Sequence, residues 1–190
     1  MIKSKIEIWK NMPRNNPEEL ALADKFYDDE LMPLSAAKFV REQGVAKEYY
    51  ALFLTLGTSW QPLALSIMAL KPQKICLMGT AKTMELVPQL IAFAGLDKNN
   101  IVCEIVDRSD VETIYASITK NYDFWKLKGN CCIDITGGTK AMASGAAMMG
   151  AVLGMDIYYV ESKYLPLYRR PEPGSEYLKK LANPGEWLVR

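Results

Sequence analysis

The sequence of 190 residues predicts an α/β fold with a doubly wound, mainly parallel sheet, preceded by a helical segment. From residue 51 onward, short apolar runs alternate with segments of helical pattern, and short loops join them. The runs are almost continuously apolar, as expected of parallel strands that are covered on both faces. Apolar residues make up 49% of the chain, and its length suits one domain with a sizeable core.

The N-terminal part is expected to stand outside the main sheet. Residues 1–10 are predicted to form a short edge strand or a tail. Asn16 and Pro17 mark the start of a helix, because asparagine caps helices and proline suits a first turn. A second helix is predicted from residue 33 or 34 to residue 43. The extension at residues 10–48 is either a packing decoration or a lid or dimer arm.

The remaining chain is predicted to supply the sheet and its helices as one domain, with a core at about residues 50–162 and a C-terminal tail at 163–190. The predicted strands are 51–57, 74–78, 101–106, 131–135 and 156–160, and the predicted helices are 62–70, 82–94, 110–122, 140–153 and a short one at 175–181. Parallel strands joined by helices require right-handed crossovers. With the common strand order 3-2-1-4-5, ligands bind where the winding reverses, between the first and fourth strands.

The loop after the fourth strand, Thr136-Gly137-Gly138-Thr139-Lys140, is the main candidate site. Two glycines allow a sharp turn and a close approach of ligand to backbone. The first amides of the following helix have no internal partner, and the helix dipole is positive there, so an anion such as phosphate fits. The loop matches neither a Walker A sequence nor a dinucleotide fingerprint. The alternative is an ordinary turn with a solvated lysine.

Two further loops lie at the same predicted edge of the sheet. After Gly57 the first strand continues into Thr58, Ser59, Trp60 and Gln61, and the second strand ends in Gly79 and Thr80. The amides of Gly79 and Thr80 can contribute to the same pocket. Trp60 either packs in the protein or presents a flat surface on which a base stacks, a contact worth about 1–3 kcal/mol per base.

Composition excludes several function classes. The chain has no histidine, which rules out histidine acid–base catalysis, Ser-His triads and histidine-ligated metals. Its four cysteines fall in predicted strands without a Cys-x-x-Cys pair, which indicates buried, reduced thiols in a cytoplasmic protein and no metal or cofactor. The net charge of +1 gives no field to hold a long nucleic acid, and no apolar run is long enough to span a membrane.

The pattern Asp134-x-Thr136-Gly137-Gly138-Thr139-Lys140 after a fourth strand, with Gly57-Thr58-Ser59 after a first, resembles the CRISPR-associated Rossmann fold, or CARF, domain. The resemblance covers about residues 50–161. It implies that the protein binds cyclic oligoadenylate, the second messenger of type III CRISPR antiviral defence, as a homodimer with the ring across the twofold axis. It further implies that residues 136–140 hold phosphates and riboses, and that residues 58–61 contact adenine or ribose. A helix rich in small residues, 140–153, is compatible with such a dimer.

Whether the protein is an enzyme stays open at this point. Some members of the family cleave the ring by attack of a ribose 2′-hydroxyl on the adjacent phosphate, and here Lys140 and Ser59 would support that step. A four-membered ring is expected, with a six-membered ring as the alternative. The resemblance also implies a C-terminal effector, for which the residues after 161 leave too little chain. The protein is therefore expected to be either a free-standing sensor or ring nuclease, or the sensor part of a longer protein whose effector this chain lacks. An unrelated nucleotide-binding enzyme and a DNA-binding regulator are the lower alternatives.

Overall fold

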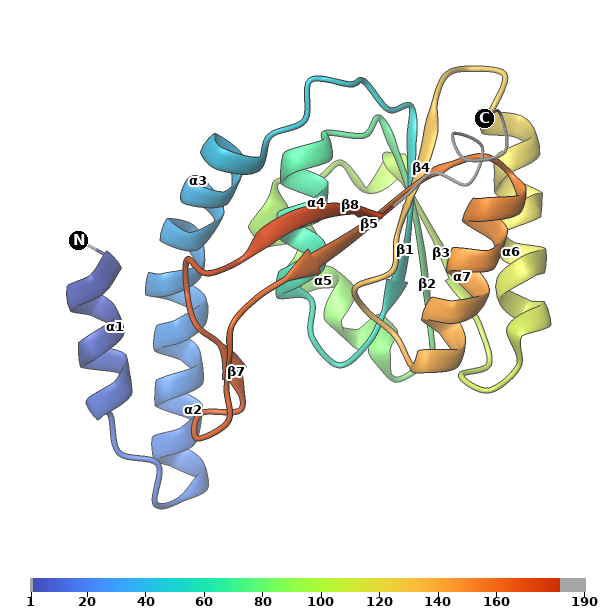
Figure 1. Cartoon of the computed structure of the whole chain (residues 1–190). Coiled ribbons are helices and arrows are strands. Elements are labelled where there is room, and N and C mark those ends of the chain that lie inside the picture. Colours follow the sequence, from blue (N-terminus) through green and yellow to red (C-terminus); the bar gives the residue numbers. More distant parts are fainter. Residues whose placement is uncertain (1, 182–190) are drawn as a thin grey trace. The chain divides into compact units, whose positions relative to one another are not determined.

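The structure is a computed structural model that describes residues 2–181 (Figure 1). The described chain divides into two compact units. One contains the N-terminal residues to Gly44 together with Glu161–Tyr177. The other contains Val45–Val160 and, within the described residues, 178–181. The predicted core therefore falls almost entirely within the second unit.

The second unit is built on a six-stranded sheet with the order β3-β2-β1-β4-β5-β8. The strands are β1 (Ala51–Leu56), β2 (Lys74–Gly79), β3 (Ile101–Ile105), β4 (Cys131–Asp134), β5 (Asp156–Glu161) and β8 (Tyr177–Leu181). Neighbouring strands from β3 to β5 pair in parallel. The predicted order 3-2-1-4-5 and the predicted α/β class are confirmed, and the winding reverses between β1 and β4.

The sixth strand, β8, corrects the prediction of a short helix at residues 175–181. Leu178 and Lys180 are two residues apart and so lie on the same side of this strand, where Leu178 packs on the core and Lys180 reaches the carboxylate of Asp156 on β5. Pairing with the edge of β5 supplies hydrogen-bond partners for the backbone, whereas a short helix would leave its terminal N–H and C=O groups without internal partners.

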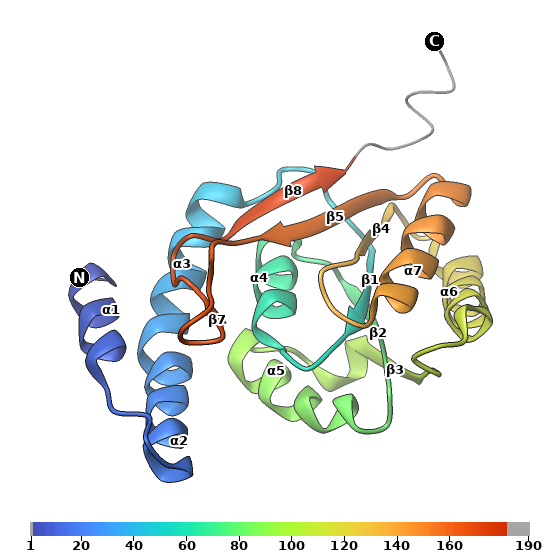
Figure 2. The ribbon, with the colours of Figure 1, turned by 60° about the horizontal axis from the view of Figure 1, so that its bottom comes forward.

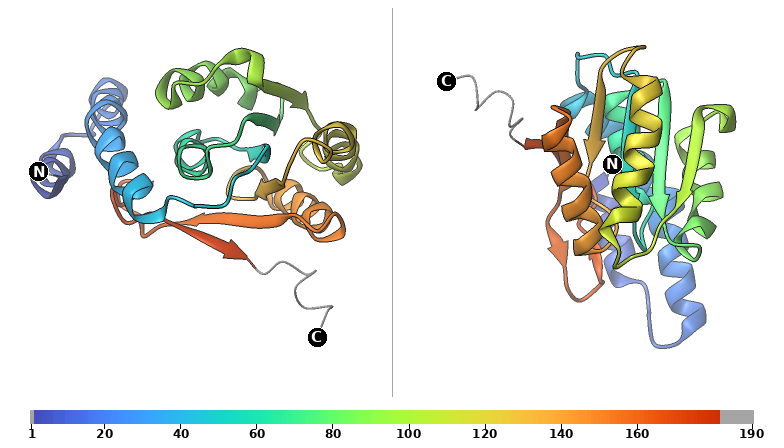
Figure 3. Two further views of the ribbon diagram at one scale, coloured as in Figure 1. Left: turned by 90° about the horizontal axis from the view of Figure 1, so that it is seen from above. Right: turned by 90° about the vertical axis from the view of Figure 1, so that its right-hand side faces the viewer.

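Helices cover both faces of this sheet (Figures 2 and 3). One face carries α4 (Gln61–Leu70) and α5 (Val87–Ala94), and the other carries α6 (Val111–Trp125) and α7 (Lys140–Val152). Successive residues of β1 supply the two cores, because Leu52 and Leu54 belong to the cluster under α4 while Phe53 belongs to the cluster under α6 and α7. This double coverage explains why β1 reads as a continuous apolar run.

The helix predicted at residues 82–94 is divided in the structure. A 3₁₀ turn, η2 (Thr83–Leu86), precedes α5, and a second one, η3 (Lys98–Asn100), precedes β3. Pro88 lies in the first turn of α5, where its missing N–H costs nothing. The α-helical ladder starts there because the proline cannot donate to the turn before it.

The first unit begins with a helix, α1 (Ile2–Asn11), so the predicted edge strand or tail is wrong. Ile2, Ile6 and Trp9 recur at helical spacing, and Ile6 and Trp9 are buried. The predicted start of the next helix is confirmed, because the Asn16 side chain accepts a hydrogen bond from the amide of Glu19 at 2.8 Å.

The two predicted N-terminal helices form one continuous helical stretch. It consists of α2 (Pro17–Phe26), a π-helical turn η1 (Tyr27–Leu31) and α3 (Met32–Gln43). Pro33 lies just after the π turn. A proline cannot donate to the carbonyl four residues earlier and clashes with it, and the wider turn accommodates this defect without ending the helix.

Residues 161–177 belong to the core of the first unit. A short antiparallel pair, β6 (Tyr164–Leu165) and β7 (Arg170–Pro171), brings Tyr168 to the N-terminal helices. The rings of Trp9 and Tyr168 lie 4.8 Å apart, and the guanidinium of Arg14 lies 4.8 Å from the Tyr168 ring. Arg170 pairs with Asp24 at 2.8 Å. Residues 161–177 are thus packed against the N-terminal helices of this unit, whereas residues 182–190 of the predicted tail lie outside the described residues.

Two further expectations concern side chains and membranes. Cys76, Cys131 and Cys132 are buried, but Cys103 is exposed on the edge strand β3, so the prediction of four buried thiols is wrong for that residue. Within residues 2–181, no helix is long and apolar enough to cross a membrane.

Candidate functional site

The glycine loop between β4 and α7 packs backbone against backbone on the loop that follows β1. A Cβ atom at Gly57 would lie 2.7 Å from the amide nitrogen of Gly138, and one at Gly137 would lie 2.1 Å from the carbonyl oxygen of Thr55. Gly138 has a φ of +80°, in the region that favours glycine. The Thr55 hydroxyl donates to the Gly137 carbonyl at 2.7 Å. The two loops predicted to meet at the switch point therefore do meet.

Asp134, at the end of β4, anchors the start of this loop through buried hydrogen bonds. Its carboxylate is buried and accepts hydrogen bonds from the Ser66 hydroxyl at 2.5 Å and from the Thr136 amide at 2.8 Å. Burial raises the pKa of Asp134, and these hydrogen bonds only partly oppose it. The residue therefore serves as an internal anchor and is out of reach of a ligand.

Replacing Asp134 separates its hydrogen-bonding role from its charge. We expect Asp134→Ala to lower the free energy of unfolding by about 1–3 kcal/mol, because two buried donors lose their acceptor. Asp134→Asn keeps an acceptor for the Thr136 amide and removes a buried charge, so its loss should be clearly smaller. Urea unfolding measures both values, and equal losses in the two variants would contradict the anchoring role.

The two threonines of the loop use their hydroxyls within the protein. The Thr136 hydroxyl accepts a hydrogen bond from the amide of Val160 on β5 at 2.8 Å. The Thr139 hydroxyl caps α7 by accepting from the Met142 amide at 3.2 Å, and it donates to the carbonyl of Arg108 at 2.8 Å. Both contacts fix the shape of the loop. Direct contact of Thr136 and Thr139 with a ligand stays a prediction.

Three side chains around the loop are exposed and unengaged. Within residues 2–181, the structure gives no hydrogen bond or ion pair to the side chains of Thr58, Ser59 or Lys140. Lys140 is the first residue of α7, where the helix amides lack internal acceptors and the dipole is positive. Two hydroxyls, a cation and glycine backbone at one sheet edge form a surface suited to an anionic, hydroxyl-bearing ligand.

Trp60 and Gln61 lie in the protein interior. Trp60 is only 6% exposed, and its ring lies 5.0 Å from that of Phe93 on α5. It directly precedes α4, and Gln61 is the first residue of that helix and is also buried. The packing alternative for Trp60 is the one that the structure supports, and little of its ring is left for a base to stack on.

Gly79 and Thr80 shape the neighbouring loop after β2. The Thr80 hydroxyl accepts from the Thr83 amide at 3.2 Å, and the Thr83 hydroxyl occupies the space where a Gly79 side chain would lie. The Gly79 carbonyl accepts from the Val106 amide at 2.9 Å. Their contribution to a ligand pocket stays a prediction.

Arg108 is a residue at this edge that the sequence reasoning passed over. It lies in the loop after β3, and strand order puts β3 at the far edge of the sheet from β4. The start of α6, however, packs beside α7, with the Val111 side chain 3.4 Å from the position of a Cβ at Gly145. The bond from Thr139 to the Arg108 carbonyl therefore joins the two loops. The sequence signal that could have pointed to Arg108 is its position just after the end of the predicted third strand.

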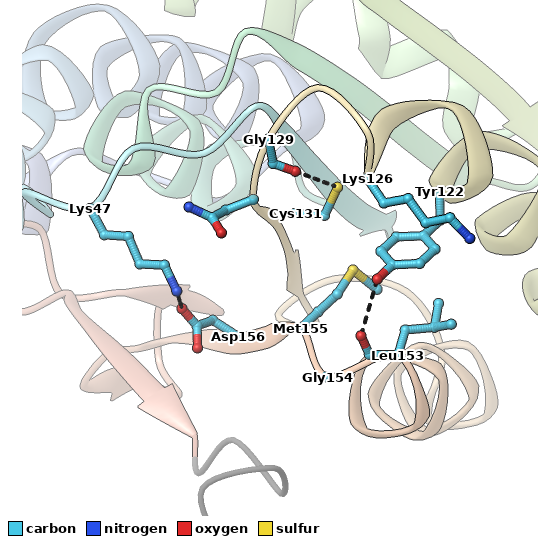
Figure 4. A pocket seen from close by; sticks show the side chains of 10 residues that line it. Lys47, Tyr122, Lys126, Gly129, Cys131, Leu153, Gly154, Met155 and Asp156 are labelled. Carbon is cyan, nitrogen blue, oxygen red and sulfur yellow. Dashed lines mark hydrogen bonds and ion pairs between the residues drawn. The ribbon is translucent and has the colours of Figure 1, made fainter.

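A hollow of about 180 Å³ lies at the opposite end of the strands, near the amino ends of β4 and β5 (Figure 4). Its polar groups bond to one another: Lys47 donates to Asp156 at 2.6 Å, and the Tyr122 hydroxyl donates to the Leu153 carbonyl at 3.2 Å. This hollow is thus an internally satisfied polar region. The candidate ligand site remains at the carboxyl ends of the strands.

Comparison with known proteins adds one sequence relative and two solved structures, while no family model matches the chain. The CRISPR system endoribonuclease Csm6 of Thermus thermophilus is 31% identical over 141 residues, which are 71% of this chain and 30% of that protein. Can2 from Sulfobacillus thermosulfidooxidans in complex with cyclic tetra-adenylate aligns with a TM-score of 0.54, 21% identity and coverage of 70% of this chain and 37% of its own.

Csm6 from Enterococcus italicus, bound to cyclic hexa-2′-fluoro-hexa-dAMP, aligns with a TM-score of 0.55 and 12% identity over 75% of this chain and 44% of its own. The chain thus spans less than half the length of each of these proteins. The two structures share its fold, and the Thermus protein is similar to it in sequence over 71% of the chain. Together with the Asp-x-Thr-Gly-Gly-Thr-Lys loop at the switch point, they show that this chain contains a CARF domain of the type III CRISPR proteins.

Proposed function

We propose that this protein is a sensor that binds a cyclic oligoadenylate ring at the glycine loop, across a homodimer, and thereby controls an effector. The observation that carries the proposal is the close packing of Gly57 on Gly138, with Thr58, Ser59 and Lys140 exposed around it. The solved Can2 and Csm6 structures of the same fold contain cyclic oligonucleotides, which supports this choice of ligand class.

The proposed geometry assigns a task to each exposed group. Backbone amides at the start of α7 accept a phosphate, and Lys140 adds a full positive charge at the same point. The hydroxyls of Thr58 and Ser59 bond to ribose or base. A twofold dimer repeats this set, so that a ring of identical units meets the same groups on each subunit. A compact site of this kind favours four adenylates, and six would need a wider one.

In this proposal, the two compact units have different roles. The unit built on Val45–Val160 is the sensor core, and an effector on the same polypeptide or on a partner reads its state. The N-terminal unit is an accessory whose own aromatic core makes it more than a flexible extension.

A ring nuclease is the second candidate, because Ser59 and Lys140 are both exposed and unengaged in the described chain. In that reaction a ribose 2′-oxygen attacks the adjacent phosphorus, and the 5′-oxygen leaves with a proton, giving a 2′,3′-cyclic phosphate end. Ser59 would orient the ribose and Lys140 would stabilise the charge that develops on phosphate.

Lys140→Ala tests the placement of the site. We expect the variant to lose at least about tenfold in affinity for cyclic tetra-adenylate, because one full charge at the phosphate is removed. Calorimetry with cyclic tetra- and hexa-adenylate measures the affinities, and chromatography of the incubated ring separates a sensor from a nuclease. Unchanged melting temperature is expected, since Lys140 is exposed.

Lys128→Ala is the matched control. Lys128 is also exposed, lies in the turn before the amino end of β4, and has no ion-pair partner given in the described residues. Equal affinity in both variants and the wild type would disprove this position for the site. Failure of the wild-type protein to bind either ring would disprove the proposed function itself.

A further inference from the structure

The glycine loop alone offers few charges for the ligand that we propose. A cyclic tetranucleotide has four phosphodiesters, each with one negative charge, so each subunit of a twofold dimer would meet two. Lys140 is the one cation within residues 136–140. One further cation on each subunit would match the charge of the ring.

Arg108 is the cation whose backbone is bonded to that loop. Its carbonyl accepts a hydrogen bond at 2.8 Å from Thr139, the residue directly before Lys140. Val106, two residues earlier, is tied to the end of β2 through the Gly79 carbonyl at 2.9 Å. The position of the Arg108 backbone beside the site is thus fixed from both sides.

The side chain of Arg108 is exposed, and the structure gives it no ion pair within residues 2–181. The carboxylates closest to it in the chain are engaged in their own turns: Asp107 accepts from the Ser109 amide at 2.8 Å, and Asp110 accepts from the Glu112 amide at 2.9 Å. Hydrogen bonds from Ser109 lower the pKa of Asp107 most, and the positive charge of Arg108 lowers it further, so the Arg108 guanidinium is near this carboxylate without forming an ion pair with it.

We infer that Arg108 is a second phosphate-binding residue of the site, which pairs with a phosphodiester of the cyclic oligoadenylate next to the one held at Lys140. This inference rests on the proposed function. Guanidinium suits the role because its planar fork can bond two phosphate oxygens at once, whereas an ammonium acts as a point charge. The loop after β3 thereby becomes a third part of the site, beside the loops after β1 and β4.

The test compares calorimetric affinities for cyclic tetra-adenylate across a range of salt concentrations. We expect Arg108→Ala to bind at least about tenfold more weakly than wild type, and its plot of log affinity against log salt to be shallower by about 0.7, the value for one single-strand phosphate contact. Arg108→Lys should recover the salt slope but only part of the affinity. A merely structural role would not produce this pattern.

Lys82→Ala is the control, because Lys82 is an exposed cation at the same sheet edge, in the loop after β2, with no ion pair given in the described part of the chain. Equal losses of affinity in Lys82→Ala and Arg108→Ala would overturn the inference, because they would show a general electrostatic attraction of the ring by the positive charges at this edge. Wild-type affinity in Arg108→Ala, with Lys140→Ala weakened, would overturn it while the proposed function stands. No binding by wild type would instead remove the proposed function.

Discussion

Gly137→Ala is expected to abolish binding of the cyclic oligoadenylate and to lower the free energy of unfolding by about 3 kcal/mol. The added methyl would lie 2.1 Å from the carbonyl oxygen of Thr55 and 3.0 Å from a methyl of Leu63. Neither neighbour can easily move aside, because Thr55 belongs to the central strand β1 and Leu63 is buried. The loop must therefore move off β1, and the amides that would face the ligand move with it.

The measurements are urea unfolding and calorimetric titration with the ring. Gly145→Ala is the matched control, since Gly145 lies in the interior of α7 and its added Cβ would be 3.4 Å from Val111, an ordinary contact. In a helix interior, alanine is favoured over glycine by about 0.5–1 kcal/mol, so this variant should be at least as stable as wild type. If Gly137→Ala were as stable as Gly145→Ala, the close packing of the two loops would be contradicted.

The central part of the fold could be predicted because its signals are local and strong. The strands β1, β2 and β4 are apolar runs that end in glycine or polar loops, and their order follows from the rules for parallel crossovers. The position of the glycine loop followed from that order. Its packing on Gly57 was therefore foreseeable as a meeting of loops, although not as a contact between backbones.

The errors lie where a short segment depends on partners distant in sequence. Residues 175–181 could form a helix or a strand by pattern alone, and the free edge of β5 decided for a strand. For Trp60 the sequence left packing and base stacking open, and the contact with Phe93 on α5, which is distant in sequence, decides for packing. The same limit holds for Thr136, whose hydroxyl is bonded to Val160 on a later strand, a use that no local pattern indicates.

The other large effect is expected at Asp156, at the start of β5. Its carboxylate is 2% exposed and is bonded by Lys47 at 2.6 Å, by the Tyr49 hydroxyl at 2.5 Å and by Lys180 of β8 at 2.9 Å. This carboxylate therefore links three segments: β5 itself, the edge strand β8 and the segment that precedes β1. Burial by itself would raise the pKa of Asp156, but the hydrogen bonds from Lys47, Tyr49 and Lys180 outweigh it and hold this pKa well below its ordinary range.

We expect Asp156→Ala to lower the free energy of unfolding by about 2–3 kcal/mol, the value for hydrogen bonds to a charged group. The two lysines remain about half exposed, so water can solvate them, and the cost should not reach that of a fully buried broken pair. Asp156→Asn keeps an acceptor for Tyr49 and should lose less. Urea unfolding measures both, and a loss below about 0.5 kcal/mol in Asp156→Ala, the usual range of surface substitutions, would refute the anchoring role of this carboxylate.

The pH dependence of the free energy of unfolding, compared between wild type and Asp156→Asn, gives an independent check. A carboxyl group with a lowered pKa in the folded state stabilises the fold above its unfolded pKa, near 4, and this contribution is lost as the pH falls toward the folded pKa. The stability difference between wild type and Asp156→Asn should therefore be constant near neutral pH and shrink below about pH 4. Asp134 acts in the opposite direction, because its raised pKa favours the fold at acid pH. A difference that grew on acidification would show that the ionised form of Asp156 does not hold the sheet together.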